Sequence, residues 1–182
     1  MFRTFLIAIA LATTAPIAVG AETNVESAEA LVNAAAQDIA DSERAHVAEA
    51  VLSHIDTRAI ANFTLGRHGR ALPAADKARF ADSFTDFLRR QIEANAHQFS
   101  GVEVNVINTA ARNARDAIVT TEVRSDTDSL RVRWRVIERG GKWSVVDLEV
   151  AGIWLAIEQR AQVAAILSRP GANIEDVIAQ FG

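Results

Sequence analysis

The chain has 182 residues, of which 49% are hydrophobic and 23% are charged, and its formal net charge is −4. That length suits one domain with a sizeable core and a short leader. The chain has no cysteine, which excludes a disulfide scaffold and thiol chemistry, and it has no basic block of the kind that nucleic-acid binding requires.

Residues 1–21 are predicted to be a secretory signal peptide. Arg3 supplies a positive start, Phe5 to Ala12 form a short apolar run, and Val19-Gly20-Ala21 offers small residues before a cut at Glu22. The run is too short to span a bilayer, which takes about 20 residues, although a retained anchor is the alternative. We therefore expect an exported protein, cleaved near Ala21, with a single domain over 22–182.

The first half of the mature chain is predicted to be helical. Apolar residues recur at helical spacing over 24–40, from about 42 to 53, over 58–63 and over 74–99. The last of these is the longest, and it carries Phe80, Phe84 and Leu88 on one stripe. A stripe of this width would cover a sheet.

Strands follow the helices. Alternating apolar residues over 102–106, over 117–123 and on both sides of Gly140-Gly141 predict four strands in an antiparallel meander. A further helix is expected from Gly152 to a stop at Pro170-Gly171, and a last short helix after a cap at Asn173. Helices, then a sheet, then helices is the order of an α+β fold.

The hairpin around Gly140-Gly141 has one apolar and one charged face. A three-residue loop, Arg139 to Gly141, would pair Trp134 with Val146 and Val132 with Leu148, which keeps apolar residues opposite each other. The same register sets Arg133 opposite Asp147 and Arg131 opposite Glu149. We expect the helices to cover the apolar face and water to cover the charged face.

Catalytic and metal-binding patterns are absent from the sequence. His46, His54, His68 and His97 have no metal-ligand spacing, and no serine lies in a nucleophile elbow. Asp147 and Glu149 could form an acid–base pair, but arginine partners would keep both ionised. We expect no catalytic residues, no metal and no cofactor. Trp134, Trp143 and Trp154 either pack in the core or line a cavity, and the pattern alone leaves both open.

Several stretches resemble the MlaC, or toluene-tolerance, family. The resemblance lies in Leu52-Ser-His-Ile-Asp-Thr-Arg, in Leu65-Gly-Arg, in Pro73 to Leu88, in Gly141-Lys-Trp with Val145-Val-Asp, in Gly152-Ile-Trp-Leu, and in Arg160 to Arg169. Together these cover roughly residues 25–180. Trp154 departs from the family pattern, which often has serine there, and it would narrow a pocket.

The resemblance implies an α+β fold of the nuclear-transport-factor-like cone type, in which a curved four-stranded antiparallel sheet and helices enclose an apolar pocket. It implies a periplasmic phospholipid-binding carrier, treated as a monomer, that is part of an ABC-type transport system and moves lipid between an inner-membrane MCE-type transporter and an outer-membrane lipoprotein complex. The pocket would be lined by residues that the patterns place inward: Phe80, Phe84, Leu88, Val104, Val106, Ile118, Val132, Trp134, Val136, Val146, Leu148, Val150, Ile153, Trp154 and Ile157.

Two other functions fit the sequence. An enzyme on the same cone, such as a cyclase or isomerase with an apolar substrate, would need an unpaired acid or histidine inside the pocket. A structural periplasmic protein would have a filled core and no ligand.

Overall fold

The structure is a computed structural model that describes residues 19–99, 101–125 and 128–182. The predicted leader lies outside the described residues except for its last three, which belong to the first helix. The helices are α1 (Val19–Asp41), α2 (Val47–Ser53), α3 (Thr57–Leu65), α4 (Ala74–Ala94), α5 (Leu155–Leu167) and α6 (Ile174–Phe181), with short 3-10 turns at Arg44–His46, His68–Arg70 and Ala96–Phe99. The strands are β1 (Glu103–Asn113), β2 (Asp116–Arg124), β3 (Ser129–Arg139), β4 (Lys142–Val150) and β5 (Ile153–Trp154).

The α+β order is confirmed, with one more strand than expected. The sheet is antiparallel and its strands lie in chain order, β1 to β5. The fifth strand is two residues that the sequence assigned to the start of a helix. The chain reverses direction at Ala151 and Gly152, which both have positive φ. Ile153 and Trp154 then pair with the end of β4, before α5 begins. Among the described helices, none has the length and apolar character to cross a membrane.

The predicted register of the β3–β4 hairpin is wrong. The loop has two residues, Gly140 and Gly141, with φ of 61° and 83°, as the tight hairpin turn that matches strand twist requires. Such a turn alone would mix the faces. A β-bulge at Val146 keeps the apolar side chains together on one face. On one side of the bulge Val136 pairs with Val145, and on the other side Trp134 pairs with Leu148. The extra residue that we assigned to the loop lies within the strand.

The charged face changes with the register. Arg133 lies opposite Glu149 and pairs with it at 2.6 Å, instead of with Asp147. Arg135 lies opposite Asp147, but its guanidinium binds Asp116 at 2.9 Å. The expectation that water covers this face is wrong for both aspartates, since Asp116 and Asp147 are 8% and 6% exposed.

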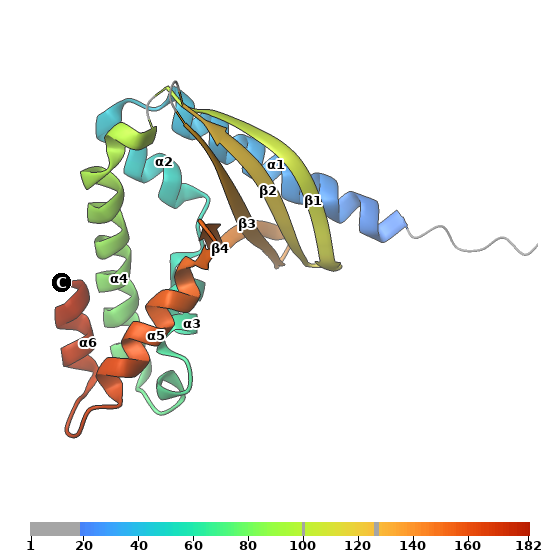
Figure 1. The fold of residues 1–182 in the computed structure, drawn as a ribbon. Coiled ribbons are helices and arrows are strands. Elements are labelled where there is room, and N and C mark those ends of the chain that lie inside the picture. Colours follow the sequence, from blue (N-terminus) through green and yellow to red (C-terminus); the bar gives the residue numbers. More distant parts are fainter. Residues whose placement is uncertain (1–18, 100, 126–127) are drawn as a thin grey trace, which may run out of the picture.

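The helices do not all cover the apolar face of the sheet, as we had expected. Among the described helices, α1 alone crosses it, and Ala28 and Val32 pack with Val119, Val136 and Val145 in one buried cluster, which we call the sheet core. The other helices form a second unit beside β4, and Figure 1 shows the two parts clearly.

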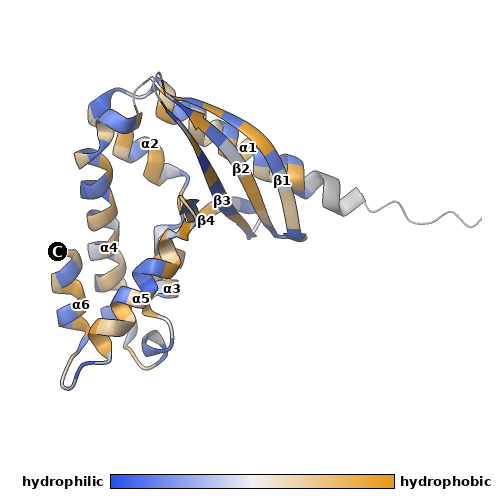
Figure 2. Cartoon of the chain, in the orientation of Figure 1, coloured by the Kyte–Doolittle hydropathy of each residue, from blue (hydrophilic) through white to orange (hydrophobic). Residues whose placement is uncertain are grey.

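This second unit has its own buried cluster, the helical core, built from α3, α4, α5 and α6. Its largest buried side chains are Phe80, Phe84 and Phe181. The ring of Phe181 lies edge-on to the other two, with centroids 5.6 and 5.4 Å away. Figure 2 shows α4 alternating between apolar and polar segments, as expected for a helix with one face in a core.

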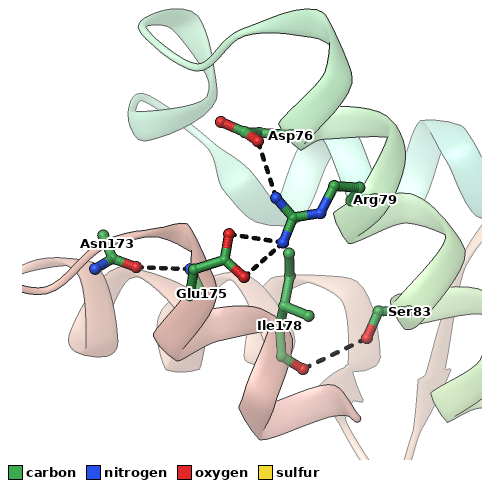
Figure 3. A network of polar contacts seen from close by, with 6 residues as sticks. All are labelled: Asp76, Arg79, Ser83, Asn173, Glu175 and Ile178. Carbon is green, nitrogen blue, oxygen red and sulfur yellow. Dashed lines mark hydrogen bonds and ion pairs between the residues drawn. The ribbon is translucent and has the colours of Figure 1, made fainter.

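A polar network holds α6 against α4 (Figure 3). Arg79 on α4 donates to both carboxylate oxygens of Glu175 at 2.6 and 2.5 Å, and Ser83 donates to the carbonyl of Ile178. Asn173 caps α6 in a reciprocal capping box with Asp176. These polar contacts fix the direction of α6, a helix of only eight residues. Phe181 buries the apolar side of this helix in the helical core.

Phe181→Ala should therefore destabilise the protein strongly. Removing a fully buried phenylalanine costs about 3–5 kcal/mol, because the transfer free energy is lost and a cavity remains. Urea unfolding followed by tryptophan fluorescence would measure the change. Phe63→Ala is the matched control: Phe63 is 37% exposed, so about 1 kcal/mol or less is expected. Equal losses in the two variants would contradict the assignment of Phe181 to the helical core.

Candidate functional site

The two cores meet at residues 54–56, between α2 and α3. This segment runs parallel to β4 and forms a short bridge with it, in which Val145 donates to the carbonyl of His54 and Asp56 donates to the carbonyl of Val145, both at 2.9 Å. Ile55 between them packs against both cores. Because the bulge sits at Val146, the joint and the distortion of β4 are next to each other.

Side chains reinforce the joint. Asp56 caps α3 by accepting from the backbone of Ala59 at 2.9 Å, and its other oxygen accepts from Arg139 at 2.8 Å. His54 contacts Asp38 on α1 at 2.7 Å. His54 and Asp56 thus tie α1, the β3–β4 hairpin and α3 together.

An apolar cavity of about 80 Å³ opens beside this joint, between β4, α3, α4 and α5. Its wall on the sheet side is Val145 and Leu148, and its wall on the helical side includes Phe84 and Leu88. The complete lining is Ile55, Ile60, Phe84, Leu88, Val145, Asp147, Leu148, Leu155, Ala156 and Gln159. We call this the junction pocket.

Asp147 is the charged residue of the junction pocket. One of its carboxylate oxygens accepts from the backbone N–H groups of Leu148 and Ala156, both at 2.8 Å. Ala156 lies in the first turn of α5, so the carboxylate caps that helix from the neighbouring strand. Burial raises the pKa of Asp147, and the two N–H groups and the charge of Arg135 oppose this rise only in part.

Gln159 is the second polar side chain of the pocket. Within the described part of the chain, its carbonyl oxygen is buried and has no hydrogen-bond partner. A buried acceptor without a donor raises the free energy of the folded state. A pocket with apolar walls and one unsatisfied acceptor is suited to a mainly apolar ligand that carries a polar group.

The predicted pocket residues fall into four groups. Phe84, Leu88 and Leu148 line the junction pocket. The sheet residues facing α1 are Val104, Val106, Val132, Trp134, Val136 and Val150. Phe80 lies in the helical core. The remaining five lie elsewhere: Ile118, Val146, Ile153, Trp154 and Ile157.

There are clear physical reasons why the five residues of the last group do not line the junction pocket. Ile118 pairs with Arg135, so it is on the charged face, and its neighbours Ala117 and Val119 point to α1 instead. Val146 is the bulge residue. Ile153 and Ile157 are each 54% exposed. Trp154 lies under the guanidinium of Arg133, 5.3 Å from its ring centroid, on the charged face, and it is not among the residues that line the junction pocket.

Trp134 lies in the sheet core, where its indole N–H donates to Thr121 at 2.9 Å. Sequence reasoning missed seven of the residues that line the junction pocket, for two reasons. Val145 and Asp147 were misplaced by the register. Ile55, Ile60, Leu155, Ala156 and Gln159 belong to helix starts and turns, whose contacts depend on how two separate cores meet.

Removing the charge of Asp147 tests the electrostatics of the pocket. Since its folded-state pKa is raised, protonation favours the folded state, and its contribution to stability declines as pH rises through the ordinary range for aspartate near ~4 and above. Asp147→Asn keeps an oxygen that can accept from Leu148 and Ala156. The free energy of unfolding of this variant, relative to the unaltered protein, should therefore increase from pH 3 to pH 7.

The measurement is urea unfolding over that pH range. Asp82→Asn is the control, because Asp82 is exposed on α4 and does not line the junction pocket. A relative stability of Asp147→Asn that falls with rising pH would mean that the folded protein stabilises the charged carboxylate.

The chain was compared with protein families, solved structures and curated proteins. Residues 22–182 match the family model described as MlaC protein. Among solved structures, the fold is similar to that of a phospholipid-binding protein from Ralstonia solanacearum in complex with a phospholipid. The TM-score is 0.73 at 17% sequence identity, over 87% of this chain and 94% of that chain. A comparison with curated proteins gives no match.

Proposed function

The chain belongs to the MlaC family, and on that premise we propose that it binds phospholipid and carries it across the periplasm. The observation that carries the proposal is the junction pocket, whose mainly apolar walls are supplied by side chains of both cores. The shared fold with a structure that holds a phospholipid supports the same conclusion.

The physical need for a carrier follows from the chemistry of the cargo. A lipid with two long chains has about 30 methylene groups, and exposing them to water costs on the order of 20 kcal/mol. An apolar pocket removes this barrier without making or breaking a bond. The carrier therefore needs no catalytic residue.

Uptake of a chain requires the junction pocket to widen. Its volume of about 80 Å³ is well below the ~300 Å³ or more of a typical ligand pocket. The pocket lies where the two cores meet, so widening it would move β4 away from α4 and α5 and expose core side chains, among them Phe84 and Val145, to the ligand. Acyl chains would then lie between β4 on one side and α4 and α5 on the other. Of the residues predicted from sequence, Phe84, Leu88 and Leu148 would contact them first.

The remaining assignments are part of the same proposal. Residues 1–21 would be removed on export, and 22–182 would act as one lipid-binding unit in the periplasm, as a monomer. The membrane partners would be an inner-membrane MCE-type ABC transporter complex and an outer-membrane lipoprotein complex. Family membership and the leader pattern support these assignments.

Native mass spectrometry of protein purified from the periplasm tests the cargo and the leader together. We expect a polypeptide that begins at Glu22 with an added mass that organic extraction identifies as phospholipid. Leu148→Trp should lower the bound fraction by about tenfold, because overfilling the pocket is costly for ligand and protein. Leu130→Trp is the matched control, since Leu130 is 42% exposed on β3.

Circular dichroism would show that both variants fold. A protein that carries no lipid, and takes up none from phospholipid vesicles, would contradict the proposal. Equal lipid content in Leu148→Trp and Leu130→Trp would mean that the lipid does not bind in the junction pocket.

An enzyme with an apolar substrate is the second candidate, and Asp147 is the observation in its favour. It is a carboxyl group with a raised pKa at an apolar pocket, as acid–base chemistry requires. Its hydrogen bonds to α5 give it a structural role already, so we favour the carrier. The same extraction separates the two: a carrier releases its lipid chemically unchanged, whereas an enzyme also yields a product that Asp147→Asn does not form.

A further inference from the structure

A second hollow, distinct in character from the junction pocket, lies between the start of α3 and the end of the β3–β4 hairpin. It has a volume of about 370 Å³ and shares only Ile55 with the junction pocket. Basic side chains from three places converge on it: Arg58 from α3, Arg139 from the end of β3 and Lys142 from the start of β4. We call it the cationic cleft.

The charges of the cationic cleft do not cancel. Asp56 is its one acidic residue, and both oxygens of that carboxylate are already engaged, one by Arg139 and the other by the backbone of Ala59. Within the described residues, the side chains of Arg58 and Lys142 are exposed and form no ion pair or hydrogen bond. The cleft thus has an excess of positive charge on a chain whose net charge is −4.

Neutral donors complete the lining. Thr57 and Ser144, which carry hydroxyl groups, are also among the residues that line the cleft. Arg139 uses one of its five N–H donors on Asp56, so the others remain available. Guanidinium groups match the oxygen geometry of phosphate, and a lysine adds a compact charge. A carboxylate would engage one or two of these groups, whereas a tetrahedral phosphate offers oxygens to all three cations.

We propose that the cationic cleft binds a phosphate group. The group is either part of a lipid head group at a membrane surface or a soluble phosphate, and the two sources share the chemistry that the cleft recognises. The site is separate from the acyl-chain site, so the proposal does not depend on the lipid cargo. Its affinity should fall as salt is added, because the charges are exposed and the screening length is ~10 Å at 0.1 M.

The test compares two double variants that remove the same charge. The first, Arg58→Gln with Lys142→Gln, removes the two positively charged side chains of the cleft that have no ion pair. Arg44→Gln with Lys77→Gln removes one arginine and one lysine elsewhere, and these also have no ion pair within the described part of the chain. Neither pair of changes removes an ion pair or a side-chain hydrogen bond of the described residues, so both variants should fold.

Two probes are used on the full mature protein. Inorganic phosphate is titrated while backbone amide signals are followed by NMR, and binding to phosphatidylglycerol vesicles is measured by cosedimentation. With phosphate, signals of residues 53–58 and 137–144 should shift, and the affinity should drop by about tenfold in the cleft variant only.

Each outcome bears on the proposal. A selective loss with inorganic phosphate supports a soluble source. A selective loss only with vesicles supports a lipid head group. If the cleft variant and the control variant behave alike with both probes, the proposal is overturned. Leu148→Trp should leave the titration with inorganic phosphate unchanged, which separates this test from that of the lipid cargo.

Discussion

The joint between Val145 and residues 54–56 is the constraint on which the rest of the structure depends. Two backbone hydrogen bonds of 2.9 Å and one shared side chain, Ile55, connect a sheet core to a helical core. The sheet core is covered by α1, and the helical core is built around the phenylalanine cluster. The junction pocket lies at the boundary between them and is lined by side chains of both.

The β-bulge makes this joint possible. A two-residue turn is the tightest way to connect β3 and β4, but it would place charged residues in the core unless one residue is added to a strand. The added residue, Val146, directly follows the residue that bonds to the 54–56 segment. The same strand then places Asp147 where it can cap α5. Turn length, pocket wall and helix position are therefore coupled through three consecutive residues.

Apolar and charged surfaces are kept apart on the two sides of this arrangement. The junction pocket has apolar walls with one buried carboxylate and one unsatisfied amide oxygen, while the cationic cleft at the hairpin end is lined by charged groups and hydroxyls. A phospholipid has the same division, with long apolar chains and an anionic head group. A protein that handles such a molecule gains from separating the two kinds of surface, because a charge inside an apolar pocket is costly and an apolar wall in a polar cleft adds little.

The sequence by itself determined most helices and strands, the α+β order and the family, because helical and strand periodicity are local and each of these elements has several apolar residues to mark it. The cap at Asn173 was also visible, since a cap acts within three residues. The sequence also singled out Phe84, Leu88 and Leu148, which line the junction pocket. Only the tertiary structure decided the hairpin register, the division into two cores and the remaining pocket lining. A bulge of one residue reverses the side-chain facing of a strand without changing its alternating pattern, so Val145 and Val146 cannot be told apart by pattern. Phe80 and Phe84 would show the same stripe against a sheet or against α6, because burial depends on apolar surface and not on which element covers it.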